Sequence, residues 1–458
     1  MKLSLFSTLR GYRKEYLLKD IFSGIIIAAV SIPISMGYAQ ISGIPAVYGL
    51  YGSVLPILLF ALFSTSKAVY LGVDAAPAAI VGGALSTLGI AAESETAMDY
   101  VPAIALFAGL WLFVFFLLHA DKIVDFISTP VMGGFISGIA VTIILMQIPK
   151  LMGSPAGSGE LLELAEHIFA AAKNISWLSL CMGLGALILI RIFKKLAPKF
   201  PMAIAIMALG VLSTVVFHVD EKGVVLLQSV ERGLPSLVIP DFGNVDLTQA
   251  AGRGLMVAVV IMAETLLAEN TFAFRNDYKL NDRQEILSCA AGNIAAAAVG
   301  CCPVNGSISR TSLNEQYGGK SQAVSITAGI TMALILLFGT GFIGYLPVPV
   351  LTAIVISALM DVVETHLAVR LFKVSRTEFY IFMAAGFSVL CLGTIYGVII
   401  GILLSFVAVI LKATNPPRSF RGMIPGRDVY FDLSRNRYAI PSKALSSTVS
   451  VRTCFSQM

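Results

Sequence analysis

Charged side chains are scarce in this chain: Asp, Glu, Lys and Arg make up only 13% of its 458 residues, whereas 57% are hydrophobic. A soluble globular protein carries about 25% charged residues, so a surface that faces mostly water is excluded. The net charge of +5 arises from 32 basic and 27 acidic side chains, a balance that excludes a nucleic-acid-binding protein and a disordered chain. The composition predicts a membrane protein that crosses the bilayer many times.

Motifs of catalysis and metal binding are equally scarce. The six cysteines show no CxxC or CxxH spacing, which argues against a disulfide framework and a metal site. No GxSxG, HExxH, Walker or GxGxxG motif occurs in a fitting context, so we expect no enzyme, no metal and no cofactor. The first apolar run follows a polar, basic leader without a cleavage site, which predicts a retained first helix.

Apolar runs fill most of the chain. Because about 20 residues of helix cross a hydrocarbon core of about 30 Å, we predict fourteen spans in an all-α polytopic fold, seven on each side of a polar stretch. The first seven are 21–39, 47–63, 72–90, 100–118, 126–147, 176–192 and 200–217. The second seven are 251–272, 285–300, 306–315, 322–343, 347–360, 377–392 and 395–411.

The distribution of Lys and Arg orients these spans, because basic residues accumulate in cytoplasmic loops. With the N-terminus inside, only five of the 32 fall in outer segments: Lys150, Lys173, Lys222, Arg232 and Arg253. Seven is odd, so the second half enters from the opposite side as an inverted repeat. The predicted organisation is a cytoplasmic leader (1–20), a first repeat (21–217), an extracytoplasmic loop (218–250), a second repeat (251–412) and a cytoplasmic tail (413–458).

The third segment of each half is interrupted, and paired interrupted segments of inverted repeats mark the midplane site of a transporter. Pro303 and Gly306 predict an extended stretch that opens a short helix. The free N–H groups at its start would attract an anion. Arg310, one turn later, would add a fixed positive charge, unless its side chain snorkels to the cytoplasmic surface.

The matching segment of the first half begins near Gly72. Its Asp74 either caps the following helix or adds a carboxylate to the site. Small residues there would let the backbone approach a ligand. Pro33, Ser35 and Gly37 predict a break in the first span that would line the same cavity.

Glu264 lies inside a predicted span, where ionisable groups survive mainly beside a cavity or a partner. A buried carboxyl group of this kind can exchange a proton near neutral pH, so we predict a coupling site. Two alternatives remain open: a permanently protonated Glu264 that bonds between helices, or one that Arg310 neutralises.

Four stretches resemble three signatures of the SulP (SLC26) anion transporters, and the resemblance covers nearly the whole chain. Residues 29–39 (AVSIPISMGYA) and 43–51 (GIPAVYGLY) resemble the opening signature. Residues 263–267 (AETLL) are similar to the acidic motif of the eighth helix, and residues 303–314 (PVNGSISRTSLN) to that of the tenth.

This resemblance implies a UraA-like fold of two inverted seven-helix repeats, in which a core domain (helices 1–4 and 8–11) moves against a gate domain in an elevator-like cycle. It also implies a homodimer and an anion held between the third and tenth helices. With the small residues of the broken segments, the predicted substrate site is Asp74, Ala75, Ser35, Gly306, Ser307, Ser309 and Arg310. Glu264 falls at the coupling-ion position, and Ala268, where sodium-coupled relatives have a hydroxyl, favours a proton.

Two departures from the family pattern stand out. Val73 replaces a proline, which predicts a less rigid entry to the third helix. Residues 422–430 resemble the linker to a cytoplasmic STAS domain, but residues 446–458 match no STAS strand, so we expect this domain to be absent.

The hypothesis from sequence is therefore a proton-coupled symporter of a small anion (dicarboxylate, sulfate or bicarbonate) in a bacterial inner membrane. Its partners would be the anion and the lipid bilayer, with no nucleic acid. The alternatives are an anion exchanger or uniporter, a passive channel, and a nucleobase permease on the same fold, against which Arg310 argues.

Overall fold

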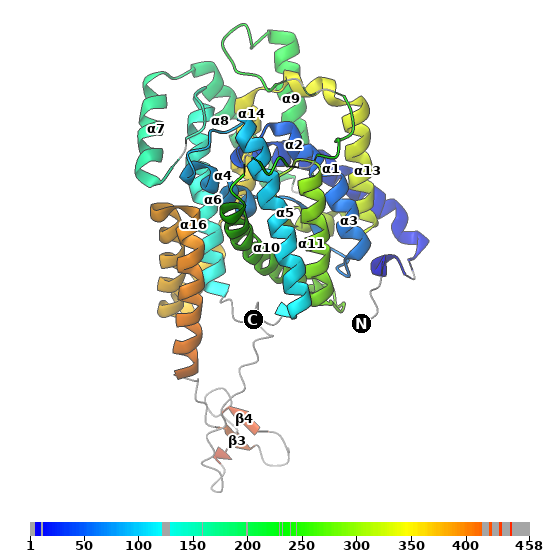
Figure 1. The fold of residues 1–458 in the computed structure, drawn as a ribbon, viewed down its shortest axis with the longest axis vertical. Helices are drawn as coiled ribbons and strands as arrows, with labels where there is room; N and C mark the ends of the chain where they lie inside the picture. Colours follow the sequence, from blue (N-terminus) through cyan, green and yellow to red (C-terminus); the bar gives the residue numbers. More distant parts are fainter. Residues whose placement is uncertain are drawn as a thin grey trace.

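The computed structural model is a bundle of helices (Figure 1), and each of the fourteen predicted spans overlaps one of them. It describes residues 5–10, 12–120, 129–157, 159–197, 200–228, 230, 232–238, 240–243 and 245–414, together with three short strands of the tail. Most of the predicted tail, including residues 446–458, lies outside the described residues.

Each half contains a short strand that lies between two helices. The first half contains η1 (Ser7–Leu9), η2 (Lys14–Tyr16), α1 (Leu17–Ile41), α2 (Ala46–Tyr51), α3 (Leu55–Phe63), β1 (Tyr70–Val73), α4 (Ala75–Thr87), α5 (Glu95–Leu118), α6 (Thr129–Leu151), α7 (Leu161–Lys173), α8 (Trp177–Leu196) and α9 (Met202–Phe217). The second contains α10 (Leu247–Arg275), α11 (Asp282–Ala298), β2 (Val304–Ser307), α12 (Ile308–Tyr317), α13 (Ala323–Phe338), η4 (Thr340–Tyr345), α14 (Val348–Val362), α15 (Thr365–Val374) and α16 (Arg376–Thr414). In the tail, β3 (Arg421–Met423) pairs with β4 (Tyr430–Asp432) and β5 (Ile440–Pro441).

Within the described residues, seven helical segments are long and apolar enough to cross a membrane: 14–41, 46–63, 95–118, 129–151, 177–196, 247–275 and 348–374. The apolar helices α4, α9 and α13 are shorter. Two predicted spans, 377–392 and 395–411, lie in α16 on either side of Gly393, whose backbone is not helical (φ 83°, ψ 167°). The number of fourteen crossings stays a prediction.

The predicted span 47–63 corresponds to one apolar helical segment, 46–63, in which residues 52–54 separate α2 from α3. One local expectation was wrong. The first span has no break, since α1 continues through Pro33. A proline removes one backbone hydrogen bond from a helix, and packing against neighbouring helices allows a membrane helix to continue past it.

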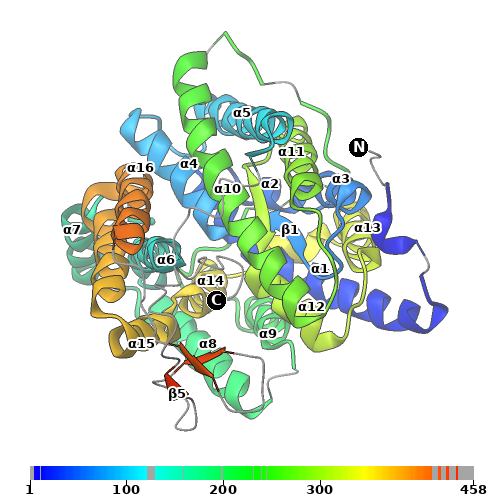
Figure 2. The same cartoon turned by 90° about the horizontal axis from the view of Figure 1, so that it is seen from below.

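The helices form two groups, which correspond to the predicted core and gate domains. In the core group, α1 packs on α2 and α13, and α11 on α3 and α5; in the gate group, α6 packs on α14 and α16, and α8 on α14. Figure 2 shows the gate helices α6, α7, α15 and α16 on one side and the core helices α5, α11 and α13 on the other. The groups meet where α1 contacts α14 and where α4 contacts α6 and α16.

The two halves meet at the centre of the core group through β1 and β2. These strands pair antiparallel, with Tyr70 opposite Ser307 and Val73 opposite Val304, and every residue of both strands is buried. Helix α4 begins directly after Asp74, and α12 directly after Ser307. The interrupted segments, which are more than 230 residues apart in the sequence, are therefore adjacent in the fold.

Candidate functional site

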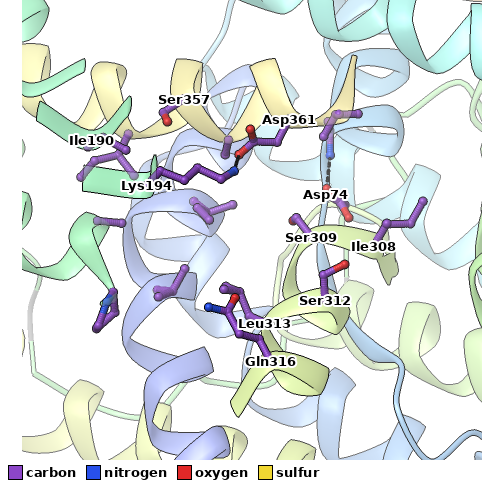
Figure 3. A pocket seen from close by; sticks show the side chains of 18 of the residues that line it. Asp74, Ile190, Lys194, Ile308, Ser309, Ser312, Leu313, Gln316, Ser357 and Asp361 are labelled. Carbon is purple, nitrogen blue, oxygen red and sulfur yellow. Dashed lines mark hydrogen bonds and ion pairs between the residues drawn. The ribbon is translucent and has the colours of Figure 1, made fainter. Parts of the chain in front are cut away.

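A cavity of about 450 Å³ lies between the core and gate groups, beside the starts of α4 and α12. Its core wall carries the polar side chains of Asp74, Glu264 and Ser309, and its gate wall is largely apolar, with Ile136, Ile139, Ile190 and Ile354. Figure 3 shows Asp74, Ser309 and Ser312 on the core side and Lys194 with Asp361 across from them. The cavity thus lies between a polar patch of the core and a gate wall that combines apolar side chains with Lys194, Ser357, Asp361 and Glu364.

The first turn of α12 forms part of the core wall, and the N-terminal end of a helix carries a partial positive charge. Ser307 precedes it without capping it by a side-chain hydrogen bond, and its hydroxyl lies 3.3 Å from that of Ser309. Ile308 and Ser309 both line the cavity. Helix α4 differs, because Asp74 Oδ1 accepts a hydrogen bond of 2.8 Å from the Ala75 N–H. The capping role predicted for Asp74 is present, and its carboxylate also lines the cavity.

Arg310 is fully buried behind this wall. Its guanidinium donates to the Val73 carbonyl and, over 3.4 Å, to Ser35 Oγ. Nη2 lies 3.8 Å from Asp74 Oδ2, and Cζ lies 5.4 Å from the centre of the Tyr70 ring. Arg310 therefore neither snorkels to the surface nor lines the cavity, and its charge faces Asp74.

Strand β1 lies close to this guanidinium because of one small residue. A Cβ atom added at Gly72 would stand 2.8 Å from Arg310 Nη1 and 3.2 Å from Cζ. Such distances are shorter than a normal van der Waals contact. The absence of a side chain at Gly72 thus gives Arg310 its space.

Glu264 is held beside the same strand pair by a chain of hydrogen bonds. Asn305 Nδ2 donates to Glu264 Oε2 over 2.5 Å, and Thr265 Oγ1 donates to Asn305 Oδ1 over 2.5 Å. The Gly306 N–H in turn donates to Thr265 Oγ1 over 3.0 Å. Since Arg310 pairs with Asp74, it is not the neutralising partner of Glu264.

The structure separates the predicted site residues into two layers. Asp74, Ala75, Ser309 and Glu264 line the cavity. The others, Ser35, Gly306, Ser307 and Arg310, are buried and do not line it.

Sequence reasoning missed several residues that shape the site. Asn305 and Thr265 lie inside the motifs 303–314 and 263–267. Their positions directly beside Gly306 and Glu264 in the sequence could have identified them. Ser312 and Gln316 follow Ser309 at helical spacing and line the same cavity. Nothing in the sequence indicated the gate-side residues Lys194 and Asp361.

The gate side of the cavity carries an exposed charged cluster. Asp361, on α14, accepts a hydrogen bond of 2.8 Å from Arg191 and another from Lys194, both on α8. The side chains are between a third and a half exposed. Two cations share one carboxylate, so the cluster keeps a net positive charge. In the described residues, no three His, Cys, Asp or Glu side chains gather as metal ligands do.

Comparisons with known proteins agree with this architecture. A probable sulfate transporter of Mycobacterium tuberculosis is 26% identical over 417 residues, which cover 91% of this chain and 74% of that protein. The chloroplastic sulfate transporter 4.1 of Arabidopsis thaliana is 30% identical over 441 residues, which cover 94% of this chain and 64% of that protein.

Two solved structures share the fold. The transmembrane domain of the cyanobacterial bicarbonate transporter BicA superposes with a TM-score of 0.75 at 19% identity, covering 86% of this chain and 98% of that one. The murine Solute Carrier 26 family member A9 anion transporter in the inward-facing state gives a TM-score of 0.81 at 18% identity, covering 95% and 75%. The description of the sulfate permease family matches residues 17–385, most of the chain. The protein therefore belongs to the sulfate permease (SulP/SLC26) family, and it is a membrane-embedded anion transporter rather than an enzyme.

Proposed function

We propose that this protein is a proton-coupled symporter of a small anion and works by an elevator-like movement of the core group against the gate group. One observation carries the proposal: the first turn of α12, which has no side-chain cap, and the carboxyl group of Glu264 line the same cavity. The two features supply an anion site and a titratable acid within one compartment. We place the protein in a bacterial inner membrane, as a homodimer with both termini cytoplasmic.

The anion would bind at the start of α12. The positive end of a helix and its free N–H groups favour an anion, and the Ser309 hydroxyl can donate a further hydrogen bond. Asp74 would repel the ligand if it stood alone, but Arg310 lies 3.8 Å from it and offsets its charge. Arg310 thus supports the anion from behind the wall without touching it.

Glu264 would carry the proton. An anion that enters a cell works against the membrane potential, which costs about 2.3 kcal/mol per net charge per 100 mV. A proton taken up with the anion cancels one negative charge. Ala268 follows Glu264 by one turn and offers no side-chain oxygen, so a sodium ion would lack a ligand there.

The names of the relatives support a small anion as the substrate. The similar proteins are named as transporters of sulfate and of bicarbonate, and a dicarboxylate remains a third candidate. All three need a positive helix end and differ in size and geometry. The apolar part of the gate wall consists of Ile136, Ile139, Ile190 and Ile354. These side chains form no hydrogen bonds that would have to break when the core group moves past them.

Uptake into proteoliposomes tests the proposal. We would supply labelled sulfate, bicarbonate or succinate outside, impose an inward proton gradient, and follow the internal pH with a trapped dye. We expect saturable uptake of one anion class that the gradient drives and that acidifies the interior. Saturable uptake without acidification would indicate the exchanger or uniporter, flux without saturation the channel, and competition by uracil the nucleobase permease. Each of these results would contradict the proposal.

A further inference from the structure

A second, smaller cavity lies on the predicted cytoplasmic side of the core group and shares no lining residue with the cavity described above. Its volume is about 170 Å³. Its wall is formed by η2, by the links between α3 and β1 and between α10 and α11, and by the end of α12 with the link that follows it. Because these segments come from both halves of the chain, the cavity is a product of the fold rather than of one loop.

Two lysines that line this cavity, Lys67 and Lys320, have no acidic partner among the ion pairs of the described residues. Lys67 Nζ lies 5.7 Å from the centre of the Tyr278 ring, whose hydroxyl lies 3.2 Å from Ser66 Oγ. The backbone N–H of Lys320 donates to Asp20 Oδ1 over 2.7 Å. Both cations therefore belong to segments that specific contacts hold in place.

Glu315 also lines the cavity, but other groups already offset its charge. Its Oε2 accepts a hydrogen bond of 2.9 Å from Arg275 Nη1, and its Oε1 accepts one of 2.9 Å from Asn276 Nδ2. Asp20 is fully buried and does not line the cavity. Even when Asp20 is counted, the two lysines and Arg275 outnumber the two acids, so the cavity keeps a net positive charge.

Helix α1 leads from this cavity into the predicted membrane with exposed apolar side chains. Leu18, Ile21 and Phe22 follow one another at helical spacing and are between 37% and 79% exposed. Tyr16, which lines the cavity, directly precedes α1. The Phe22 ring packs edge to face on that of Tyr317, at the end of α12, with 6.2 Å between the ring centres. The apolar face of α1 and the positively charged cavity are therefore neighbours.

We propose that this cavity binds the phosphate group of an anionic phospholipid of the cytoplasmic leaflet, with an acyl chain along the exposed face of α1. Lysine ammonium groups bind phosphate and each offer three hydrogen-bond donors. Basic pockets between membrane helices on the cytoplasmic side suit such headgroups. The orientation rests on the distribution of Lys and Arg. No residue of the proposed anion and proton sites is involved, so the two proposals can fail separately.

Thermal unfolding of the full chain in detergent micelles tests the site, because a ligand that binds the native state raises the unfolding midpoint. The probes are dioleoylphosphatidylglycerol, dioleoylphosphatidylcholine and inorganic phosphate. We expect the phosphatidylglycerol to raise the midpoint more than the phosphatidylcholine does, and inorganic phosphate to leave it unchanged. In Lys67→Gln/Lys320→Gln, the mole fraction of phosphatidylglycerol that gives half of the effect should rise by about 30-fold, because two cations near the headgroup are lost.

The matched control is Lys195→Gln/Lys373→Gln, which removes two exposed lysines from the same predicted side but outside this cavity. We expect it to respond to phosphatidylglycerol like the wild type. An equal loss in both double variants would overturn the proposal, since a basic surface would then attract the lipid without a site. An unchanged response in Lys67→Gln/Lys320→Gln would also overturn it.

Inorganic phosphate distinguishes the source of the ligand. If it raised the midpoint of the wild type but not of Lys67→Gln/Lys320→Gln, the cavity would bind a soluble phosphate compound, and the lipid would be rejected. If the double variant fails to fold, the single variants Lys67→Gln and Lys320→Gln provide the second test. Each should shift the half-effect mole fraction of phosphatidylglycerol by about fivefold, and wild-type values in both would contradict the site.

Discussion

Arg310 and Asp74 form a buried ion pair. Because Arg310 offsets the negative charge of Asp74, the pair affects the affinity of the cavity for an anion. We expect Arg310→Met to weaken anion affinity by about 100-fold, because it leaves the Asp74 carboxylate unpaired beside the ligand; removal of one partner of a buried pair costs about 3–5 kcal/mol. Competition binding at constant pH measures the change. The double variant Arg310→Met/Asp74→Asn should recover much of the affinity, since the repelling charge is gone. Equal affinities in the wild type and Arg310→Met would refute this role.

The pH dependence of anion affinity tests the role of Glu264, because proton coupling fixes its direction. If the anion and a proton bind together, the affinity of the wild type for the anion rises as the pH falls, by up to about tenfold per pH unit. Glu264→Gln keeps the hydrogen bond from Asn305, because an amide oxygen also accepts. We expect it to bind the anion with an affinity that no longer varies between about pH 5.5 and 8.5 and to lose gradient-driven uptake. Calorimetry at several pH values checks the first result. If the anion affinity of Glu264→Gln still depended on pH, a group other than Glu264 would carry the coupled proton.

At the scale of elements, the fit between β1 and α12 depends on Gly72. Gly72→Ala would place a Cβ atom 2.8 Å from Arg310 Nη1, and such overpacking costs about 1–3 kcal/mol. We therefore expect a lower unfolding midpoint and an anion affinity weakened by about tenfold, because Arg310 must move away from Asp74. The matched control is Gly252→Ala, since a Cβ atom there meets nothing within 4 Å. The unfolding midpoint and the anion affinity of both variants test this prediction. If Gly72→Ala and Gly252→Ala gave the same values, Gly72 would not be needed to position Arg310.

The elements also show what sequence reasoning can and cannot predict. The spans and the two interrupted segments were predictable, because apolar length and the Pro303–Gly306 interruption are local signals. That the two segments meet followed from the inverted repeat, in which such segments lie at matching positions. The amphipathic helices α7 and α15 were missed, since a search for about 20 apolar residues passes over short helices with one polar face. The position of Arg310 behind the wall was also missed. It depends on Gly72, Val73 and Asp74, which are more than 230 residues away in sequence.

At the scale of the whole molecule, the described residues include a polar contact between the two groups of helices away from the cavity. Lys150, at the end of α6 in the gate group, donates to Gln40 Oε1, at the end of α1 in the core group, over 3.0 Å. Both ends lie on the predicted outer side, whereas the cavity leads to Lys194 and Asp361 on the predicted inner side. The contact would thus stabilise the state in which the cavity opens inward.

This arrangement predicts a shift between two states. A hydrogen bond to a charged group contributes about 1.5 kcal/mol or more, so Lys150→Met should raise the ratio of outward-open to inward-open molecules by about tenfold. We would place a reporter by Ser312→Cys in a cysteine-free chain and compare its reaction with an impermeant maleimide from each side of the membrane. Lys173→Met, a change at an exposed lysine on the same predicted side, should leave the ratio unchanged. A ratio that Lys150→Met also leaves unchanged would mean that the Lys150–Gln40 contact does not distinguish the two states, and that apolar packing of α1 on α14 alone sets their balance.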